Sequence, residues 1–219
     1  MMKAILASPV YLLVSVLFWL FFWKFGHPML WAAFGLGVLG WWIAYLLRAP
    51  ISLVLIKIAH EKQPKGIVYF SGLLEESVRL IVLKMTGTSF QQAISVGQGW
   101  AFIEVLFAIV NLLALTNLNN KSDEKSLQAK EMLSDAGIKL DGSPFWGALE
   151  RVFASGFHIG STLLIARNPW MILAMIPVHT AYNVMATRLL LKRSIVTTEL
   201  VGALFGSVVF IVGLFVYFV

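Results

Sequence analysis

The hydrophobic positions of this chain fall into long, almost unbroken runs separated by short polar stretches. A helix that crosses the roughly 30 Å apolar core of a bilayer needs about 20 mostly apolar residues. Seven runs approach that length, and we predict a membrane-spanning helix in each: 4–23, 28–47, 66–86, 91–115, 144–166, 168–191 and 195–219. The pattern therefore predicts an all-α integral membrane protein, with residues 1–219 forming a single polytopic domain.

Shorter features interrupt these runs. Arg48-Ala-Pro50 predicts a helix break, because proline lacks a backbone N–H and restricts the residue before it. The apolar stretch 51–59 is too short to cross, so it should extend a helix or lie in the membrane interface. Residues 116–142 form a polar loop, in which 122–133 has the pattern of a short amphipathic surface helix.

The first run needs to be distinguished from a cleaved signal peptide. Met1-Met2-Lys3 precedes it, and a basic residue at this place is also typical of a secretory signal peptide, where it precedes the apolar core. The run is longer than a typical signal core and lacks a clear small-residue cleavage site, so we predict an uncleaved anchor.

Composition supports the membrane assignment and narrows the chemistry. The chain is 59% hydrophobic and 13% charged, whereas soluble domains are about 45–50% apolar and about 25% charged. The absence of cysteine excludes disulfides, thiol nucleophiles and thiolate metal ligands. The net charge of +6 resides mostly in short loops, where basic residues orient membrane helices, so no nucleic-acid partner is expected.

The distribution of lysine and arginine predicts the orientation. Twelve of the 17 basic residues fall on one side of the predicted topology, three on the other, and Arg79 and Arg151 lie within spans. Cytoplasmic loops carry the excess of positive charge. The N-terminus should therefore be cytoplasmic and the C-terminus outside, with the bacterial plasma membrane as the expected location. The twelve are Lys3, Arg48, Lys57, Lys62, Lys65, Lys121, Lys125, Lys130, Lys139, Arg188, Lys192 and Arg193.

Candidate chemistry begins with the charged residues inside the third run. Glu75, Glu76 and Arg79 lie within two helical turns, and each ionised group at the centre of a bilayer costs about 2.5–3.5 kcal/mol on insertion scales. Such residues are usually functional. The structural alternative is that Glu75 and Arg79, four residues apart, neutralise each other as a buried pair. That alternative leaves Glu76 unexplained.

Polar residues recur in the next three predicted spans. A rise of about 1.5 Å per residue places several of them near the middle of the bilayer, so we predict that they meet in a four-helix polar core. Two structural alternatives stay open: Glu150 and Arg151 as a structural or snorkelling pair, and His158 as a bond between helices. The residues are Glu104, Glu150, Arg151, His158, His179 and Asn183.

Several standard catalytic motifs are absent. The chain contains no G-x-S-x-G, C-x-x-C or H-E-x-x-H, and His60-Glu61 is followed by Lys-Gln-Pro. A serine peptidase or a metalloprotease of the HExxH type is therefore not expected.

Three segments carry a family resemblance in their order along the chain: Glu75-Glu76-Ser-Val-Arg79, Trp100-Ala-Phe-Ile-Glu104 and His179-Thr-Ala-Tyr-Asn183. They resemble the motifs of the CAAX-processing and bacteriocin-processing (CPBP) and PrsW-type membrane endopeptidases, over about residues 66–191. Glu104 and the segment Glu150-Arg151…His158 are most similar to PrsW and the YhfC-type branch. Arg79 comes one position earlier than the basic residue of the CAAX enzymes, and Glu104 replaces a histidine.

The resemblance implies an intramembrane protease, a hydrolase that cleaves membrane proteins or peptides with a glutamate-activated water. Glu75 would be the base, Glu104 would hold the water, and His179 and Asn183 would donate to the oxyanion. Glu76 and Arg79 would orient the base, and His158 would be an accessory donor. Glu150 and Arg151 would be further accessory residues. No cofactor is expected; the metal alternative is zinc held by Glu75, Glu104, His158 and His179.

Two other classes of function remain as alternatives. A proton-coupled transporter also uses buried Glu, His and Arg, but it typically shows an internal repeat, and none is apparent in this sequence. A non-catalytic scaffold would present the same polar core to a partner helix. The sequence names no substrate, and a CAAX substrate is not inferred.

Overall fold

The computed structural model describes residues 2–59, 65–135, 144–192 and 195–218. These ranges are helical and contain no strand, which confirms the predicted all-α fold. Two short 3₁₀ helices, Lys65–Phe70 and Pro169–Met171, precede α4 and α8. The helices are α1 (Met2–Lys24), α2 (Trp31–Leu46), α3 (Arg48–Ala59), α4 (Ser71–Thr86), α5 (Phe90–Asn119), α6 (Glu124–Asp135), α7 (Pro144–Arg167), α8 (Ile172–Lys192) and α9 (Ile195–Phe218).

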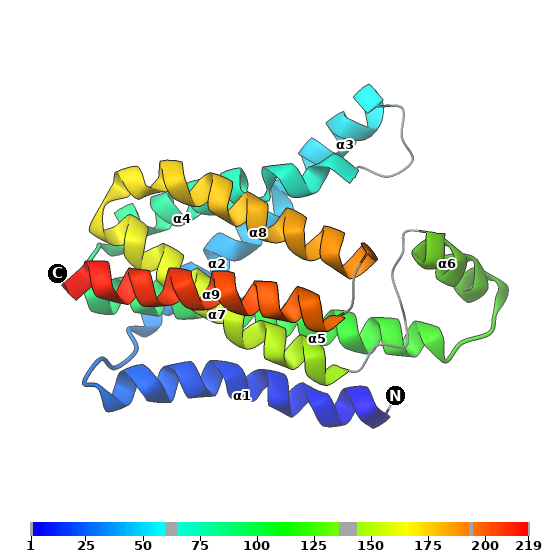
Figure 1. The fold of residues 1–219 in the computed structure, drawn as a ribbon, viewed down its shortest axis with the longest axis horizontal. Helices are drawn as coiled ribbons and strands as arrows, with labels where there is room; N and C mark the ends of the chain where they lie inside the picture. Colours follow the sequence, from blue (N-terminus) through cyan, green and yellow to red (C-terminus); the bar gives the residue numbers. More distant parts are fainter. Residues whose placement is uncertain (1, 60–64, 136–143, 193–194, 219) are drawn as a thin grey trace.

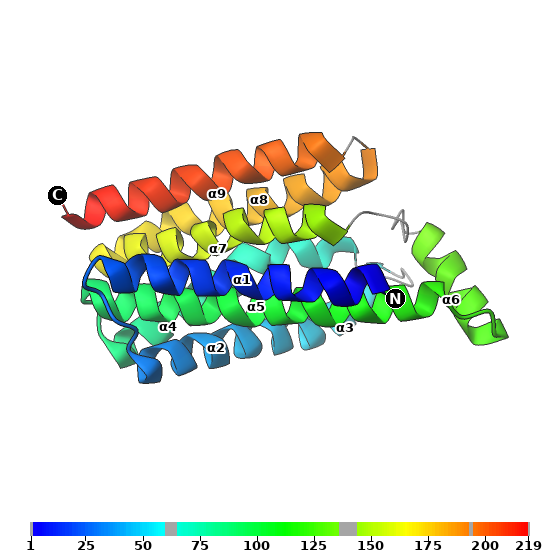
Figure 2. The ribbon, with the colours of Figure 1, turned by 90° about the horizontal axis from the view of Figure 1, so that it is seen from below.

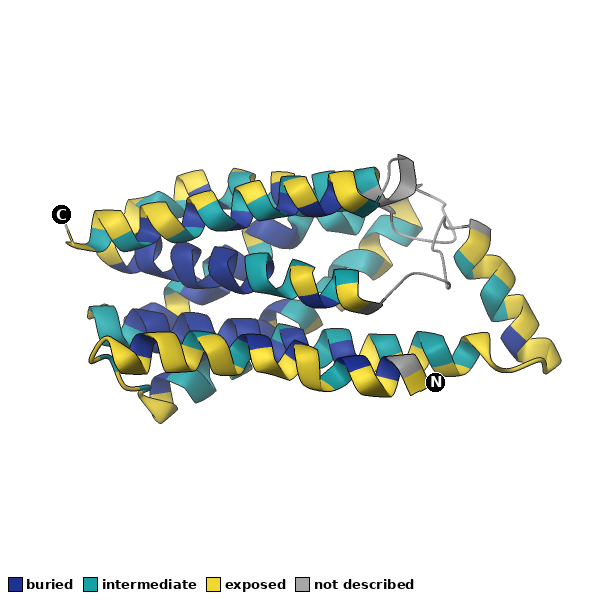
Figure 3. Ribbon diagram, turned by 60° about the horizontal axis from the view of Figure 1, so that its bottom comes forward, coloured by how far each residue is buried: buried dark blue, intermediate teal, exposed yellow. Residues whose placement is uncertain are grey.

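The long helices lie side by side along one axis as a bundle (Figures 1 and 2). Helix α7 is the central element, packed against α9, α5 and α1, and residues 154–166 are all buried. The dark buried stretch of this helix is visible in Figure 3. The N-terminus, α3 and α6 lie at one end of the bundle and the C-terminus at the other.

Four segments of the described chain are long and apolar enough to cross a membrane: Ala4–Lys24, Trp31–Ile58, Phe90–Asn119 and Ile195–Phe218. Helices α4, α7 and α8 lie where three more spans are predicted, but they do not meet this criterion. Helix α4 has 16 residues, and all three carry the polar side chains of the predicted core, which lowers their hydropathy. The count of seven spans therefore stays a prediction.

The structure bears on the local predictions around α3 and α6. Helix α2 ends at Leu46 and α3 begins at Arg48, so the predicted break occurs at Leu47, directly before Arg48-Ala-Pro50. Pro50 lies in the first turn of α3, where a missing N–H is tolerated. Stretch 51–59 extends that helix, as expected. Helix α6 confirms the amphipathic helix, and Asp123 accepts hydrogen bonds from Ser126 N and Oγ at its start.

Some sequence predictions fall outside the described residues. They concern Met1, the His60-Glu61 pair, three of the basic residues used for orientation (Lys62, Lys139 and Arg193), and the end of the polar loop, 136–142.

Glycines allow the helices that carry the polar core to approach closely. A Cβ added at Gly72 of α4 would lie 2.2 Å from the carbonyl oxygen of Ile176 in α8, and one at Gly97 of α5 would lie 2.8 Å from Cα of Ile159 in α7. Small residues permit such close backbone contact between membrane helices. These two contacts bring α4 beside α8 and α5 beside α7, at the level of the predicted polar core.

Candidate active site

Helix α4 presents two adjacent carboxylates in different directions, because successive residues on an α-helix are rotated by about 100°. Both are buried: Glu75 is 3% exposed and Glu76 is 0% exposed. Glu75 lines a cavity, whereas Glu76 faces the interior between α4, α7 and α8. The two residues therefore have different partners.

Glu76 belongs to a closed network around the fully buried Arg79. Arg79 donates to Glu76 from Nε at 2.9 Å and from Nη2 at 3.4 Å. Its Nη1 donates to Thr162 Oγ1 at 2.7 Å and to the carbonyl of His158 at 3.2 Å, and Nη2 also donates to His158 Nδ1 at 3.0 Å. The guanidinium lies 4.3 Å from the ring of Trp100. Every N–H of this arginine thus has an acceptor, which is how a buried charge is made tolerable.

The network assigns a donating nitrogen to each of the two histidines. Since Arg79 can only donate, His158 Nδ1 accepts, and the proton lies on Nε2, which donates to Glu104. His179 Nδ1 lies 2.5 Å from Glu76 Oε1, and a carboxylate paired with arginine can only accept. The proton shared with Glu76 is therefore on Nδ1 of His179, and Nε2 of the same ring lies 3.7 Å from Glu75 Oε1.

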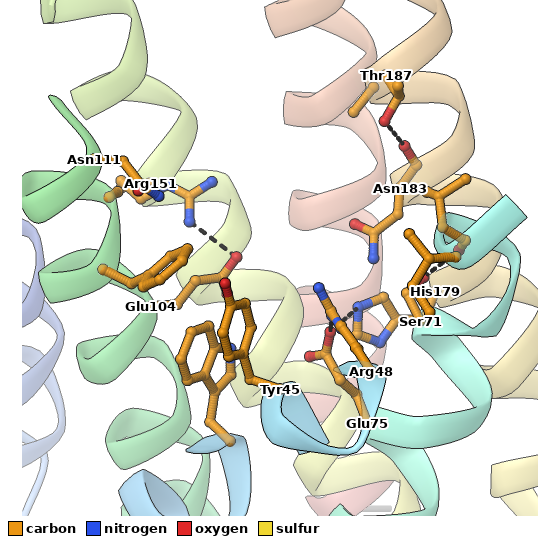
Figure 4. A pocket seen from close by; sticks show the side chains of 16 residues that line it. Tyr45, Arg48, Ser71, Glu75, Glu104, Asn111, Arg151, His179, Asn183 and Thr187 are labelled. Atoms are coloured by element: carbon orange, nitrogen blue, oxygen red, sulfur yellow. Dashed lines mark hydrogen bonds and ion pairs between the residues drawn. The ribbon is translucent and has the colours of Figure 1, made fainter. Parts of the chain in front are cut away.

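A cavity of about 400 Å³ lies between α2, α4, α5, α7 and α8. Glu75, Arg48 and His179 gather on one side of it, while Glu104 and Arg151 lie on the other (Figure 4). Its polar lining residues are Tyr45, Arg48, Ser71, Glu75, Glu104, Asn111, Arg151, His179, Asn183 and Thr187.

The two cavity carboxylates are held from both sides. Glu75 accepts from Trp100 Nε1 at 3.1 Å and forms an ion pair with Arg48. Glu104 pairs with Arg151 Nη1 at 2.9 Å through one oxygen and with His158 through the other. Both carboxylates are thereby oriented toward a common space.

The structure brings together six of the predicted site residues in one connected set: Glu75, Glu76, Arg79, Glu104, His158 and His179. Asn183 lines the cavity, and its backbone carbonyl accepts from Thr187. Glu150 and Arg151 form the ion pair considered as a structural alternative, and Arg151 also reaches Glu104. The set spans α4, α5, α7 and α8, the four elements in which the polar core was predicted.

One structural alternative is wrong. Glu75 and Arg79 do not pair: Arg79 binds Glu76 at i,i+3, and Glu75 binds Arg48 from the start of α3. The reason is that Arg79 points inward toward α7, where Thr162 and His158 supply its further acceptors.

Sequence reasoning missed three residues that hold the site. Arg48 was counted only as a loop charge, although it directly follows an apolar run. Trp100 was read as the aromatic position of a motif, with no role for its indole N–H as a donor to Glu75. Thr162, one turn after His158, gave no signal of its own and accepts from Arg79.

The fold and the site together define an all-helical membrane protein with a buried Glu, His and Arg centre that opens into a cavity. The chain belongs to the YhfC intramembrane metalloprotease family, whose model matches residues 10–206. This confirms the resemblance to the YhfC-type branch. Comparison with the curated proteins and with the solved structures gives no match.

The family's description implies a metal ion, so the donors can be compared with that requirement. Among the described residues, no three His, Cys, Asp or Glu side chains come together as a metal site would need. His158 Nε2 donates its hydrogen to Glu104, so it has no free lone pair for a metal, and Arg48 forms an ion pair with Glu75. The four-residue zinc set therefore does not fit this arrangement of side chains. The donors that do face each other are His179 Nε2 and Glu75 Oε1.

Proposed function

We propose that this protein is an intramembrane endopeptidase that hydrolyses peptide bonds of membrane-associated substrates with a water activated by Glu75. The observation that carries the proposal is that the two adjacent glutamates have different surroundings. Glu75 faces a polar cavity, and Glu76 holds the imidazole that faces Glu75. Membership of the YhfC family supports this chemistry.

Amide hydrolysis needs a base for water and an acid for the leaving nitrogen. In the proposed reaction Glu75 takes a proton from water as the water oxygen bonds to the carbonyl carbon. When the C–N bond breaks, Glu75 returns that proton to the departing amine. Glu104 is oriented by His158 and Arg151. It accepts a hydrogen bond from the other O–H of the water and so holds the water in the cavity.

The contacts of His179 refine its proposed role. Nδ1 donates to Glu76, so the nitrogen left for a substrate is Nε2, which lies 3.7 Å from Glu75 Oε1. Nε2 donates to an oxyanion only when it carries a proton, and Glu76 would then stabilise the imidazolium as a triad carboxylate does. Asn183, with its amide N–H, is the remaining donor of the predicted pair.

We also propose that the chain spans the membrane seven times as one domain, with a cytoplasmic N-terminus, in the bacterial plasma membrane. Large apolar side chains on the outer helices are exposed, including Leu13 and Leu17 of α1 and Leu204 and Phe215 of α9. A surface of this kind suits contact with lipid. The ionisable groups of the polar core lie inside the bundle, as intramembrane charges require: Glu75, Glu76, Arg79, His158 and His179.

The test is a comparison of membrane-protein N-termini in cells that express the wild type or Glu75→Gln at equal, correctly inserted levels. Glu131→Gln, on the exposed surface of α6, is the matched control. We expect new N-termini with the wild type and the control and none with Glu75→Gln, because an amide cannot take the proton from water.

Either of two results would contradict the proposal. Cleavage by Glu75→Gln would show that another group is the base. Identical termini in all three strains would favour the scaffold or the transporter over the peptidase.

A further inference from the structure

Arg48 is the cationic group that the proposed mechanism does not use. It begins α3, and its Nη2 forms the ion pair with Glu75. Its side chain is 30% exposed, whereas that of Glu75 is 5% exposed. The guanidinium also lies 5.7 Å from the ring of Tyr45. Arg48 therefore lies at the cavity wall, between the buried carboxylate and the open space (Figure 4).

The guanidinium of Arg48 has donors to spare. Arginine carries five N–H groups in a planar fork, and the hydrogen bond to Glu75 uses Nη2. Nε is buried and has no hydrogen-bond partner in the described part of the chain. Leaving a buried donor unsatisfied costs free energy, the more so on a charged group. Arg48 also lines the cavity and its side chain is 30% exposed, so the part of the fork not bonded to Glu75 is placed to meet a ligand.

The other arginines near the cavity are more fully engaged. Arg79 donates every N–H to Glu76, Thr162 and His158. Arg151 directs Nε and Nη2 to Glu150 and Nη1 to Glu104. Arg48 has one such contact, from Nη2 to Glu75, among the described residues.

The proposed reaction needs such a donor. Negative charge develops on the carbonyl oxygen as water adds, and N–H groups aimed at that oxygen stabilise it. Asn183 offers one amide group, and Nε2 of His179 faces Glu75 Oε1 at 3.7 Å. One amide donor would leave the oxyanion poorly stabilised.

We propose that Arg48 is a catalytic residue that donates an N–H to the scissile carbonyl oxygen of a peptide substrate while Nη2 holds Glu75. This proposal rests on the proposed function. In this arrangement the guanidinium contacts both the base, Glu75, and the oxyanion. It thereby sets the position of the substrate carbonyl relative to the activated water. An ammonium group is a point charge that can pair with Glu75 but does not reproduce the fork.

The test uses full-length protein in lipid nanodiscs and a synthetic peptide that spans a cleavage site found by the N-terminus comparison. Arg48→Ala should lower kcat by about 10²–10³-fold, the usual effect of losing an oxyanion donor, with little change in KM. Methylguanidinium at sub-denaturing concentration should restore part of that rate. Arg48→Lys should stay well below the wild type because it lacks the fork. Arg167→Ala, an exposed arginine near the end of α7, is the control.

Several outcomes separate this proposal from its alternatives. Full activity of Arg48→Lys would show that Arg48 acts only as a counter-charge to Glu75, and an effect confined to KM would assign it to substrate binding; either result would overturn the proposal. The same holds for Arg48→Ala at the wild-type rate. Absence of cleavage by the wild type would instead refute the proposed function itself, and the role of Arg48 with it.

Discussion

Glu75 and Glu76 are neighbours in sequence but belong to two contrasting regions. Around Glu76, the region between α4, α7 and α8 is closed: Arg79, His179 and Glu76 are each at most 2% exposed, and their polar atoms are matched. Around Glu75, the cavity wall is open and includes the partly exposed Arg48, with an unpartnered Nε. One turn of α4 thus contributes both to the closed network around Glu76 and to the cavity wall around Glu75.

The difference shows how a membrane protein can keep several charges in its interior. A buried charge is costly unless it is paired and hydrogen-bonded, and the Arg79 network meets that condition in full. The network in turn fixes the imidazole that faces Glu75. Around Glu75, by contrast, Nε of Arg48 has no hydrogen-bond partner in the described part of the chain. The comparison therefore predicts that Glu76 matters mainly for stability and Glu75 mainly for activity.

The largest expected effect separates the two glutamates by stability. Glu76→Gln removes the carboxylate partner of the fully buried Arg79, and breaking a buried pair in this way costs about 3–5 kcal/mol. Glu75→Gln removes the partner of the partly exposed Arg48 and should cost at most about 1 kcal/mol. The measurement is the unfolding free energy from SDS titration in mixed micelles, followed by circular dichroism. Equal losses for the two variants would abolish the proposed distinction.

A smaller effect tests the contact that brings α4 to His179. Gly72→Ala would place a Cβ 2.2 Å from the carbonyl of Ile176 and 2.5 Å from Thr180 Oγ1. Such overpacking costs about 1–3 kcal/mol. Gly35→Ala in α2 is the matched control, because nothing lies within 4 Å of its added Cβ. The same titration should show a loss for Gly72→Ala and none for Gly35→Ala. A neutral Gly72→Ala would mean that α4 and α8 are not in close contact.

The smallest expected effect sharpens the description of the closed region. Thr162→Val removes the hydroxyl that accepts from Arg79 Nη1 at 2.7 Å, while the His158 carbonyl remains as an acceptor, so we expect a loss of about 1 kcal/mol. Thr116→Val is matched, since both hydroxyls donate to the carbonyl four residues earlier at 2.7 Å. It should change stability by less than about 0.5 kcal/mol. Similar losses in both variants would show that Arg79 does not depend on Thr162.

Some of the local structure departed from the sequence pattern for identifiable reasons. Arg48-Ala-Pro50 predicted a break, and the break lies at Leu47, since Pro50 falls in the first turn of the next helix. The apolar runs 66–86, 144–166 and 168–191 predicted spans, yet the polar residues within them lower the hydropathy that would identify α4, α7 and α8 as spans. The amphipathic helix around residues 122–133 followed the pattern closely, because a surface helix depends on its own periodicity and cap.

The sequence by itself determined the helices, the segments that carry polar residues, and the order of motifs that led to the YhfC family. These properties are local, since apolar runs and motif spacings depend only on residues that are close together in the sequence. Only the tertiary structure decided the pairing: Arg79 with Glu76, Arg48 with Glu75, His158 Nε2 with Glu104, and His179 Nδ1 with Glu76. Partner choice depends on how each helix is rotated and crossed against its neighbours. Close backbone contacts, such as those at Gly72 and Gly97, set those rotations, and no spacing within a single helix encodes them.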